Sequence, residues 1–158
     1  MSFDGVITGA IAEEIKSRIL GGKIEKIYQP ENDELVFHIH AQGTGHRLYA
    51  SCNSSHPRIH FIREIPENPS SPLAFCMLLR KHLQSGRILD VRQKDSERII
   101  EIRVETRNEL GFSVNKRLII EIMGKHSNII LVDDESEKII DSIKRISIDV
   151  NRYRQILP

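Results

Sequence analysis

The residues with the clearest chemical potential are Gly124-Lys125-His126-Ser127, which interrupt two apolar runs. Lysine can donate to a phosphate, histidine can donate or stack, and serine adds an uncharged donor. Glycine permits a backbone conformation closed to other residues and a close approach by another chain. These residue types favour contact with an anionic ligand. A plain hairpin turn is the competing interpretation, and composition alone favours it because loops collect polar residues anyway.

A nucleotide-binding phosphate loop is excluded at this position. Its motif needs a glycine at residue 119, where this chain has Ile119, and Ser or Thr at residue 126, where it has His126. Such a loop also leads into a helix whose N-terminal amides bind the anion. Here the following residues, 128–132, are typical of a strand.

The second candidate is the pair Glu97-Arg98, which opens the apolar run 99–104. Arg98 shares a strand face with Ile100 and Ile102, the set expected to face the core. An arginine on that face either caps the end of the sheet or is directed at a ligand. The neighbouring carboxylate can hold the guanidinium in position for a phosphate or a base edge. The alternative is a solvated turn with a surface ion pair worth about 0–1 kcal/mol.

Other polar residues have simpler explanations. Asp4 can cap a helix, and the basic residues 80–82 suit the C-terminal end of one. His38, His40 and His60 raise the question of a metal site, but no cysteine or well-placed carboxylate completes a ligand set. No catalytic triad or carboxylate pair can be identified. We therefore expect no metal, no other cofactor and no enzymatic activity.

Composition limits the remaining possibilities. The 158 residues are 39% hydrophobic and 28% charged, with a net charge of +1, so any nucleic-acid surface must be a local patch. Cys52 and Cys76 are too few for a disulfide framework and indicate packing in a reducing compartment. The N-terminus lacks a basic, then apolar leader, and no run approaches the roughly 18 apolar residues of a membrane span. We expect a cytoplasmic protein without a membrane partner.

The elements that must position these residues follow from hydrophobic periodicity. Residues 4–20 are predicted to form a helix with an apolar stripe at positions 3, 7, 11, 15 and 19. A second helix begins after Pro72 and ends at Gly86. Predicted strands cover 23–29, 35–41, 46–52, 58–64, 87–93, 98–106, 112–123, 127–134 and 138–143. The order of helix, strands, helix, strands predicts an α+β fold: a mostly antiparallel β-sandwich of two sheets, flanked by two helices.

Alternation along two of these strands predicts their burial. In the strand over 98–106, the inward set is Ile100, Ile102 and Val104. The outward set is Ile99, Glu101, Arg103 and Glu105. The run 128–132 does not alternate, so we expect it to be covered on both faces.

Four segments together resemble one known family. They are "SFDG" at 2–5, "PLAFCMLLRKHL" at 72–83, "RQKDSERII" at 92–100 and "EIMGKHSNIILVD" at 121–133. In this order they resemble the N-terminal NFACT-N domain of the RqcH/NEMF family, whose bacterial members are often labelled fibronectin-binding protein A. The resemblance covers nearly the whole chain. We expect this domain over 1–148 and, over 149–158, a linker into the helical domain of a longer protein.

The resemblance implies a role in ribosome-associated quality control. Members of the family bind a stalled large ribosomal subunit that carries peptidyl-tRNA and recruit charged tRNA. The nascent chain then gains a C-terminal tail, of alanine in bacteria. The domain is expected to bind tRNA and to be similar in fold to the N-terminal domain of formamidopyrimidine-type DNA glycosylases. Those enzymes use a proline after the initiator Met as nucleophile, whereas this chain has Ser2, so no DNA partner is expected.

The resemblance also implies site residues. The family has an early Asp and an Asp-Arg pair, which fall on Asp4 and Arg98, with Glu97 in place of the usual Asp. Together with Gly124, Lys125, His126 and Ser127, these residues are expected to form one RNA-facing patch. An adhesin that binds fibronectin or fibrinogen is the alternative function, and the absence of a signal peptide weighs against it.

Overall fold

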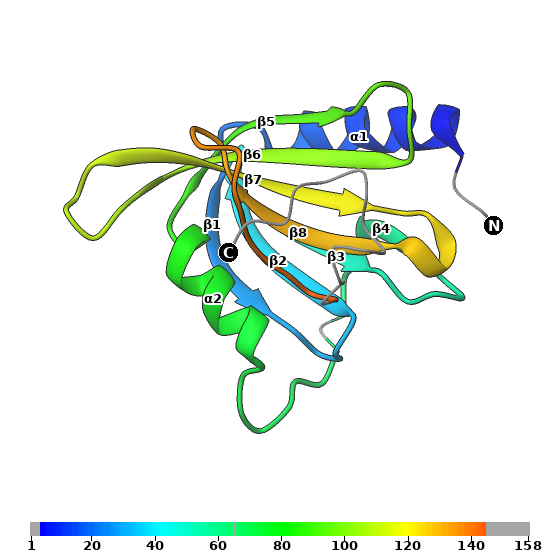
Figure 1. The fold of residues 1–158 in the computed structure, drawn as a ribbon, viewed down its shortest axis with the longest axis horizontal. Coiled ribbons are helices and arrows are strands. Elements are labelled where there is room, and N and C mark those ends of the chain that lie inside the picture. Colours follow the sequence, from blue (N-terminus) through cyan, green and yellow to red (C-terminus); the bar gives the residue numbers. More distant parts are fainter. Residues whose placement is uncertain (1–3, 65, 145–158) are drawn as a thin grey trace.

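The computed structural model describes residues 4–64 and 66–144, which form a strand-rich α+β domain (Figure 1). Ser2 and the expected linker 149–158 lie outside the described residues. The helices are α1 (Gly5–Ile19), α2 (Ala74–Leu83) and the short 3-10 helix η1 (Gly124–His126). The strands are β1 (Lys23–Tyr28), β2 (Glu34–Ala41), β3 (Thr44–Ser51), β4 (Arg58–Phe61), β5 (Arg87–Gln93), β6 (Ile99–Arg107), β7 (Ser113–Glu121), β8 (Asn128–Asp133) and β9 (Ile139–Ser142). The predicted α+β class is confirmed.

The two predicted sets of strands are joined in a single antiparallel sheet. Its order is β4-β3-β2-β1-β5-β6-β7-β8-β9. The junction is one short pairing of β1 with β5, where the Ile24 amide donates to the Gly86 carbonyl at 2.9 Å and the Ile88 amide to the Gly22 carbonyl at 2.8 Å. Residues of both halves belong to one hydrophobic cluster, so the sheet is bent and encloses its core as a sandwich would.

Helix α1 begins where the sequence predicts it. The Asp4 carboxylate accepts a hydrogen bond from the Ile7 amide at 2.8 Å, which satisfies one of the free amides of the first turn. The buried face consists of Thr8, Ala12, Ile15 and Ile19, and it packs on β5. Ile7 and Ile11 of the predicted stripe are only partly buried, so the inward face is rotated by about one residue.

Helix α2 buries Phe75, Cys76, Leu79 and Leu83 and packs against β1 and β6, one strand from each half of the sheet. The Arg80 side chain donates from Nε to the Ile27 carbonyl at 2.8 Å and so fixes the helix to β1. Both cysteines are free and buried, and burial raises the pKa of Cys52 to about 12. Within the described part of the chain, neither helix has the length and apolarity that a bilayer crossing needs.

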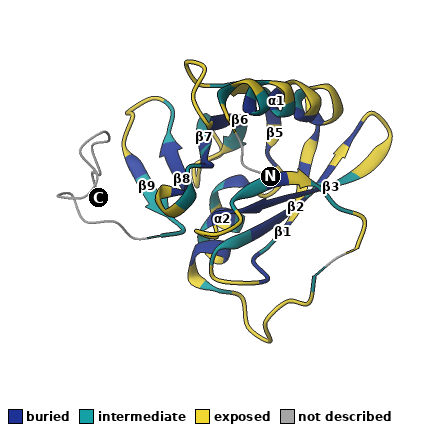
Figure 2. Cartoon of the chain, turned by 90° about the vertical axis from the view of Figure 1, so that its right-hand side faces the viewer, coloured by how far each residue is buried: buried dark blue, intermediate teal, exposed yellow. Residues whose placement is uncertain are grey.

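The outer face of β6 is the main correction to the predicted burial. Ile100, Ile102 and Val104 lie in the core as predicted, but Ile99 and Glu101 are also buried, with 6% and 3% exposure. Alternation along one strand shows which residues share a face but not what covers that face. The predicted two-sided burial of 128–132 is confirmed, because alternate residues of β8 belong to two hydrophobic clusters. Figure 2 shows the buried character of β8.

Candidate functional site

Three segments that are distant in sequence meet at the end of the sheet where β6 begins and β7 ends (Figure 1). The Gln93 side-chain amide donates to the Gly5 carbonyl and to the Glu97 carbonyl, each at 2.6 Å. The Ile122 amide donates to the Arg98 carbonyl at 2.9 Å. These bonds connect the start of α1, the β5–β6 turn and the turn after β7, which carry all the site residues predicted from sequence.

The start of α1 packs directly on the β5–β6 turn, and a glycine makes this possible. A Cβ atom at Gly5 would lie 2.3 Å from the Ser96 carbonyl oxygen, so a larger residue would force the two segments apart. Asp4 stands next to this contact, beside a shallow hollow that Gln93 and Ser96 also line. Asp4 was predicted from the sequence and Gly5 was not, although a glycine in the first turn of a helix is a signal of such a close contact.

The turn after β7 is the 3-10 helix η1 rather than a plain hairpin turn. Gly124 has φ +57°, a conformation that glycine adopts without strain. The Ser127 hydroxyl accepts a hydrogen bond from the Met123 amide at 2.8 Å, and Ser127 is 1% exposed. Its side chain therefore holds the turn closed. Lys125 and His126 are exposed and remain available to a ligand.

Arg98 is exposed at this end of the molecule. Within residues 4–64 and 66–144, its guanidinium makes no hydrogen bond or ion pair. The expected support from the Glu97 carboxylate is not formed. The Arg98 carbonyl accepts a hydrogen bond from the Ile122 amide, so residue 98 continues the ladder of β6. Consecutive side chains along a strand point to opposite faces, and those of Glu97 and Arg98 therefore diverge. The arginine is thus a positive charge that no carboxylate of the described residues compensates.

A cavity of about 940 Å³ lies between α1, the segment 54–61 and the end of the sheet that carries Arg98 and Gly124. Its charged lining is mostly basic. Arg18, Arg58 and Arg98 contribute cations, and Glu14, the acidic residue among the lining side chains, pairs with Arg18 at 3.2 Å. Although the chain is nearly neutral, positive charge is concentrated in this cavity. The low dielectric constant of the cavity wall strengthens the electrostatic potential there.

Two of these arginines are held in position by aromatic rings. The Arg18 guanidinium lies 4.9 Å from the centre of the Phe61 ring, and the Arg58 guanidinium lies 5.2 Å from that of Tyr49. Arg58 also donates from Nη1 to the His56 carbonyl at 3.1 Å. Neither arginine could be predicted from the sequence, because only the fold brings α1 and β4 beside Arg98.

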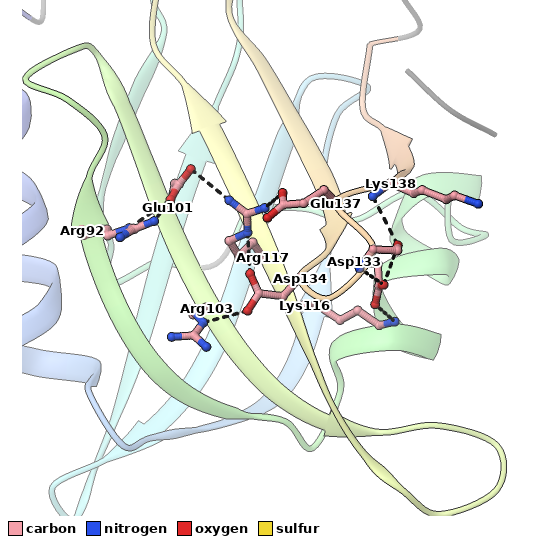
Figure 3. A network of polar contacts seen from close by, with 10 residues as sticks. Arg92, Glu101, Arg103, Lys116, Arg117, Asp133, Asp134, Glu137 and Lys138 are labelled. Carbon is pink, nitrogen blue, oxygen red and sulfur yellow. Dashed lines mark hydrogen bonds and ion pairs between the residues drawn. The ribbon is translucent and has the colours of Figure 1, made fainter. Parts of the chain in front are cut away.

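The outer face of β5–β8 carries a different arginine cluster (Figure 3). The buried Glu101 carboxylate lies 3.0 Å from Arg92 Nη2 and 3.6 Å from Arg117 Nη1. Asp134 lies 2.7 Å from Arg117 Nε and 2.9 Å from Arg103 Nε. Arg117 also pairs with Glu137. The cations on this face are matched by carboxylates, which explains why Glu101 can be buried.

Two of the three histidines considered as metal ligands contact aromatic rings, and His40 is exposed. His38 contacts Tyr28 edge to face with ring centres 5.1 Å apart, and His60 lies 5.2 Å from the Tyr49 ring. Burial, followed by the positive charges of Arg47 and Lys26, lowers the pKa of His38. Across the described residues, no three His, Cys, Asp or Glu side chains gather as metal ligands would.

Comparison with known proteins identifies the family of this chain. The family model "NFACT N-terminal and middle domains" matches residues 4–158. The Bacillus subtilis protein "Rqc2 homolog RqcH" is 44% identical over 158 residues, which are 100% of this chain and 28% of that protein. The mouse "Ribosome quality control complex subunit NEMF" is 28% identical over 134 residues, 84% of this chain and 12% of that protein. The chain thus spans less than a third of these relatives.

Two solved structures share the fold throughout. The N-terminal part of the fibronectin/fibrinogen-binding protein of Streptococcus suis superposes with a TM-score of 0.94 at 42% identity, over 99% of this chain and 59% of that one. The N-terminal domain of the fibronectin-binding protein PavA of Streptococcus pneumoniae gives 0.93 at 44% identity, with the same coverage. The chain therefore belongs to the NFACT family, that of the ribosome quality control proteins RqcH and NEMF.

Proposed function

We propose that this chain is the tRNA-binding module of a cytoplasmic ribosome-associated quality control factor. The complete factor binds stalled large ribosomal subunits that carry peptidyl-tRNA and recruits tRNA, so that the nascent chain gains a C-terminal tail of alanine. The module itself is not catalytic and needs no cofactor. It supplies a surface that grips and orients the RNA.

The observation that carries this proposal is the convergence of uncompensated cations at one end of the sheet. Arg98 has no partner among the described residues, and the turn with exposed Lys125 and His126 lies on the adjoining strand end. RNA binding is driven mainly by phosphate contacts, which need cations that the protein has not already neutralised. The cluster on the outer face, by contrast, has its carboxylates in place.

In this proposal, some site residues contact the RNA and others support the backbone. Arg98 and Lys125 are placed to contact phosphates, and His126 can stack on a base or donate to it. Ser127 closes the turn, and Asp4 caps α1 against the β5–β6 turn, so both act by holding backbone in place. A net charge of +1 is compatible with this role if other parts of the complete protein provide most of the affinity for the ribosome.

The test is tRNA binding by the complete protein and by two variants, Arg98→Ala and Lys125→Ala, at several salt concentrations. Each variant should weaken binding about tenfold, the size of one lost charge-assisted hydrogen bond. Lys138→Ala is the matched control, because Lys138 is also exposed but lies between β8 and β9, away from the site. If both site variants bind tRNA as the wild-type protein does, the assignment is wrong.

A second candidate function has one observation in its favour, namely that the two streptococcal relatives are named for fibronectin or fibrinogen binding. An adhesin must be displayed outside the cell. Protease treatment of intact cells should leave the protein undigested if the tRNA-binding proposal holds. Its digestion, together with saturable binding of the purified protein to fibronectin, would favour the adhesin.

A further inference from the structure

The turn between β5 and β6, residues 94–98, carries Arg98 and departs from a regular antiparallel ladder. The Lys94 amide donates to the Ile99 carbonyl at 3.0 Å, so it pairs with neither the Glu97 nor the Arg98 carbonyl. Backbone carbonyls of folded proteins are almost always paired. These two carbonyls therefore need donors from outside the turn.

Two groups outside the turn supply these donors. The Ile122 amide donates to the Arg98 carbonyl at 2.9 Å. Gln93, the last residue of β5, donates from its side-chain amide to the Glu97 carbonyl and to the Gly5 carbonyl in the first turn of α1, each at 2.6 Å. A side-chain amide has two N–H donors, so both are used within the protein. Gln93 therefore fixes the turn that carries Arg98 to the start of α1.

Helix α1 has room for this contact because a second glycine follows Gly5 after one turn. A Cβ atom at Gly9 would lie 2.6 Å from the Oε1 atom of Gln93, so a larger residue there would displace the glutamine. Gln93 and both glycines line the shallow hollow beside Asp4. The helix surface and the glutamine are thus matched in shape.

The turn itself has a backbone conformation that its residues do not favour. Asp95 and Ser96 have φ values of +49° and +61°, in the left-handed region that residues other than glycine rarely adopt. Aspartate tolerates this region better than serine does. Such conformations persist where surrounding contacts impose them, and they are concentrated at functional sites. The two hydrogen bonds of Gln93 are contacts of this kind.

We infer that Gln93 is a positioning residue for RNA binding and acts through Arg98. It holds the β5–β6 turn against α1 and so determines where the Arg98 guanidinium projects. It does not contact the RNA, because both of its donors are used within the protein. This inference rests on the proposed function and goes beyond it, because it names a residue outside the RNA contacts on which one of those contacts depends.

The test is a double-mutant cycle that measures tRNA binding by the complete protein. Gln93→Met keeps the length of the side chain and removes both donors. It should weaken tRNA binding about fivefold, a part of the loss expected when Arg98 itself is removed. In the Arg98→Ala background the same substitution should change binding less than about twofold, because the contact through which Gln93 acts is already absent. Gln93→Leu, which also lacks donors, should give the same pattern.

Gln29→Met is the matched control. The Gln29 side chain also joins a turn to a helix by two hydrogen bonds, donating to the Asn32 carbonyl at 3.1 Å and accepting from the Cys76 amide of α2 at 3.0 Å. It is buried, so its replacement should lower the urea midpoint of unfolding at least as much as Gln93→Met does. It should leave tRNA binding unchanged, because it acts on neither α1 nor the turn that carries Arg98.

The possible outcomes separate this inference from the function on which it rests. Equal weakening by Gln93→Met with and without Arg98 would overturn it, because Gln93 would then act independently of that arginine. A loss of tRNA binding in Gln29→Met as large as that in Gln93→Met would also overturn it, because the losses would then follow stability. If Arg98→Ala weakens tRNA binding and Gln93→Met does not, the inference is wrong and the tRNA-binding function stands. If neither variant weakens binding, both fail.

Discussion

The arginines in two regions of this molecule differ in how many carboxylates lie near them. On the outer face, Arg92, Arg103 and Arg117 are each paired with a carboxylate, and one of these carboxylates is buried (Figure 3). At the end that carries the candidate site, Arg18 pairs with Glu14 at 3.2 Å, whereas Arg58 and Arg98 form no ion pair with another described residue. The same residue type therefore stabilises the fold in one region and is available to a ligand in the other. Pairing, rather than the number of cations, distinguishes the two regions.

The largest expected effect concerns the outer face. Arg117→Met keeps most of the side-chain volume but leaves the buried Glu101 carboxylate with Arg92 alone. Removing one partner of a buried ion pair is strongly destabilising, so the free energy of unfolding in urea should fall by about 3 kcal/mol. Arg98→Met is the matched change at the candidate site and should shift it by less than about 0.5 kcal/mol. Equal losses would mean that the two regions do not differ as the geometry indicates.

A smaller effect is expected at the start of α1. Asp4→Ala removes the acceptor for the Ile7 amide and should lower the free energy of unfolding by about 1 kcal/mol. Asp4→Asn keeps a capping oxygen and should retain most of that stability. If tRNA binding weakens in Asp4→Ala but not in Asp4→Asn, Asp4 acts by holding the helix start. Equal weakening in both variants would show that its charge matters to the RNA.

The smallest effect concerns pH. The pKa of His38 is lowered by burial and then by Arg47 and Lys26, against a weaker opposing influence of Glu25. The pKa of His82 is lowered by burial and then by Lys116 and Lys81.

As the pH falls below the ordinary value of 6.5, the unfolded chain takes up these protons before the folded one. The contribution of these two histidines to the free energy of unfolding should therefore decline as the pH falls through this range and should become constant below their folded pKa values. His38→Gln should decline less steeply. A decline of the same slope in this variant would exclude His38 as a cause.

Sequence patterns predicted the local elements well and their assembly only in part. The cap at Asp4, both helices, the core face of β6 and the two-sided burial of β8 follow from short-range periodicity, which the sequence contains directly. The joining of the two strand sets through β1 and β5 does not follow from short-range periodicity, because it depends on a pairing between segments about 60 residues apart along the chain. Long-range pairing has no local signature.

The candidate site shows the same limit. Arg98 and Lys125 were noticeable because their residue types interrupt apolar runs, whereas Arg18 and Arg58 stand in ordinary surface patterns. Only the packing of α1 and β4 around the cavity gives them a shared role. Glu101 was misassigned to solvent because its partners come from β5 and β7, which alternation along β6 does not reveal.

The most direct test of the difference between paired and unpaired arginines is the salt dependence of tRNA binding. The complete protein is compared with Arg98→Ala and with Arg103→Ala, whose arginine is exposed but paired with Asp134. Arg98→Ala should bind more weakly, and the slope of log affinity against log salt should become shallower by about one phosphate contact. Arg103→Ala should match the wild-type protein in both quantities. Equal slopes and affinities in all three proteins, or the larger loss in Arg103→Ala, would contradict the account.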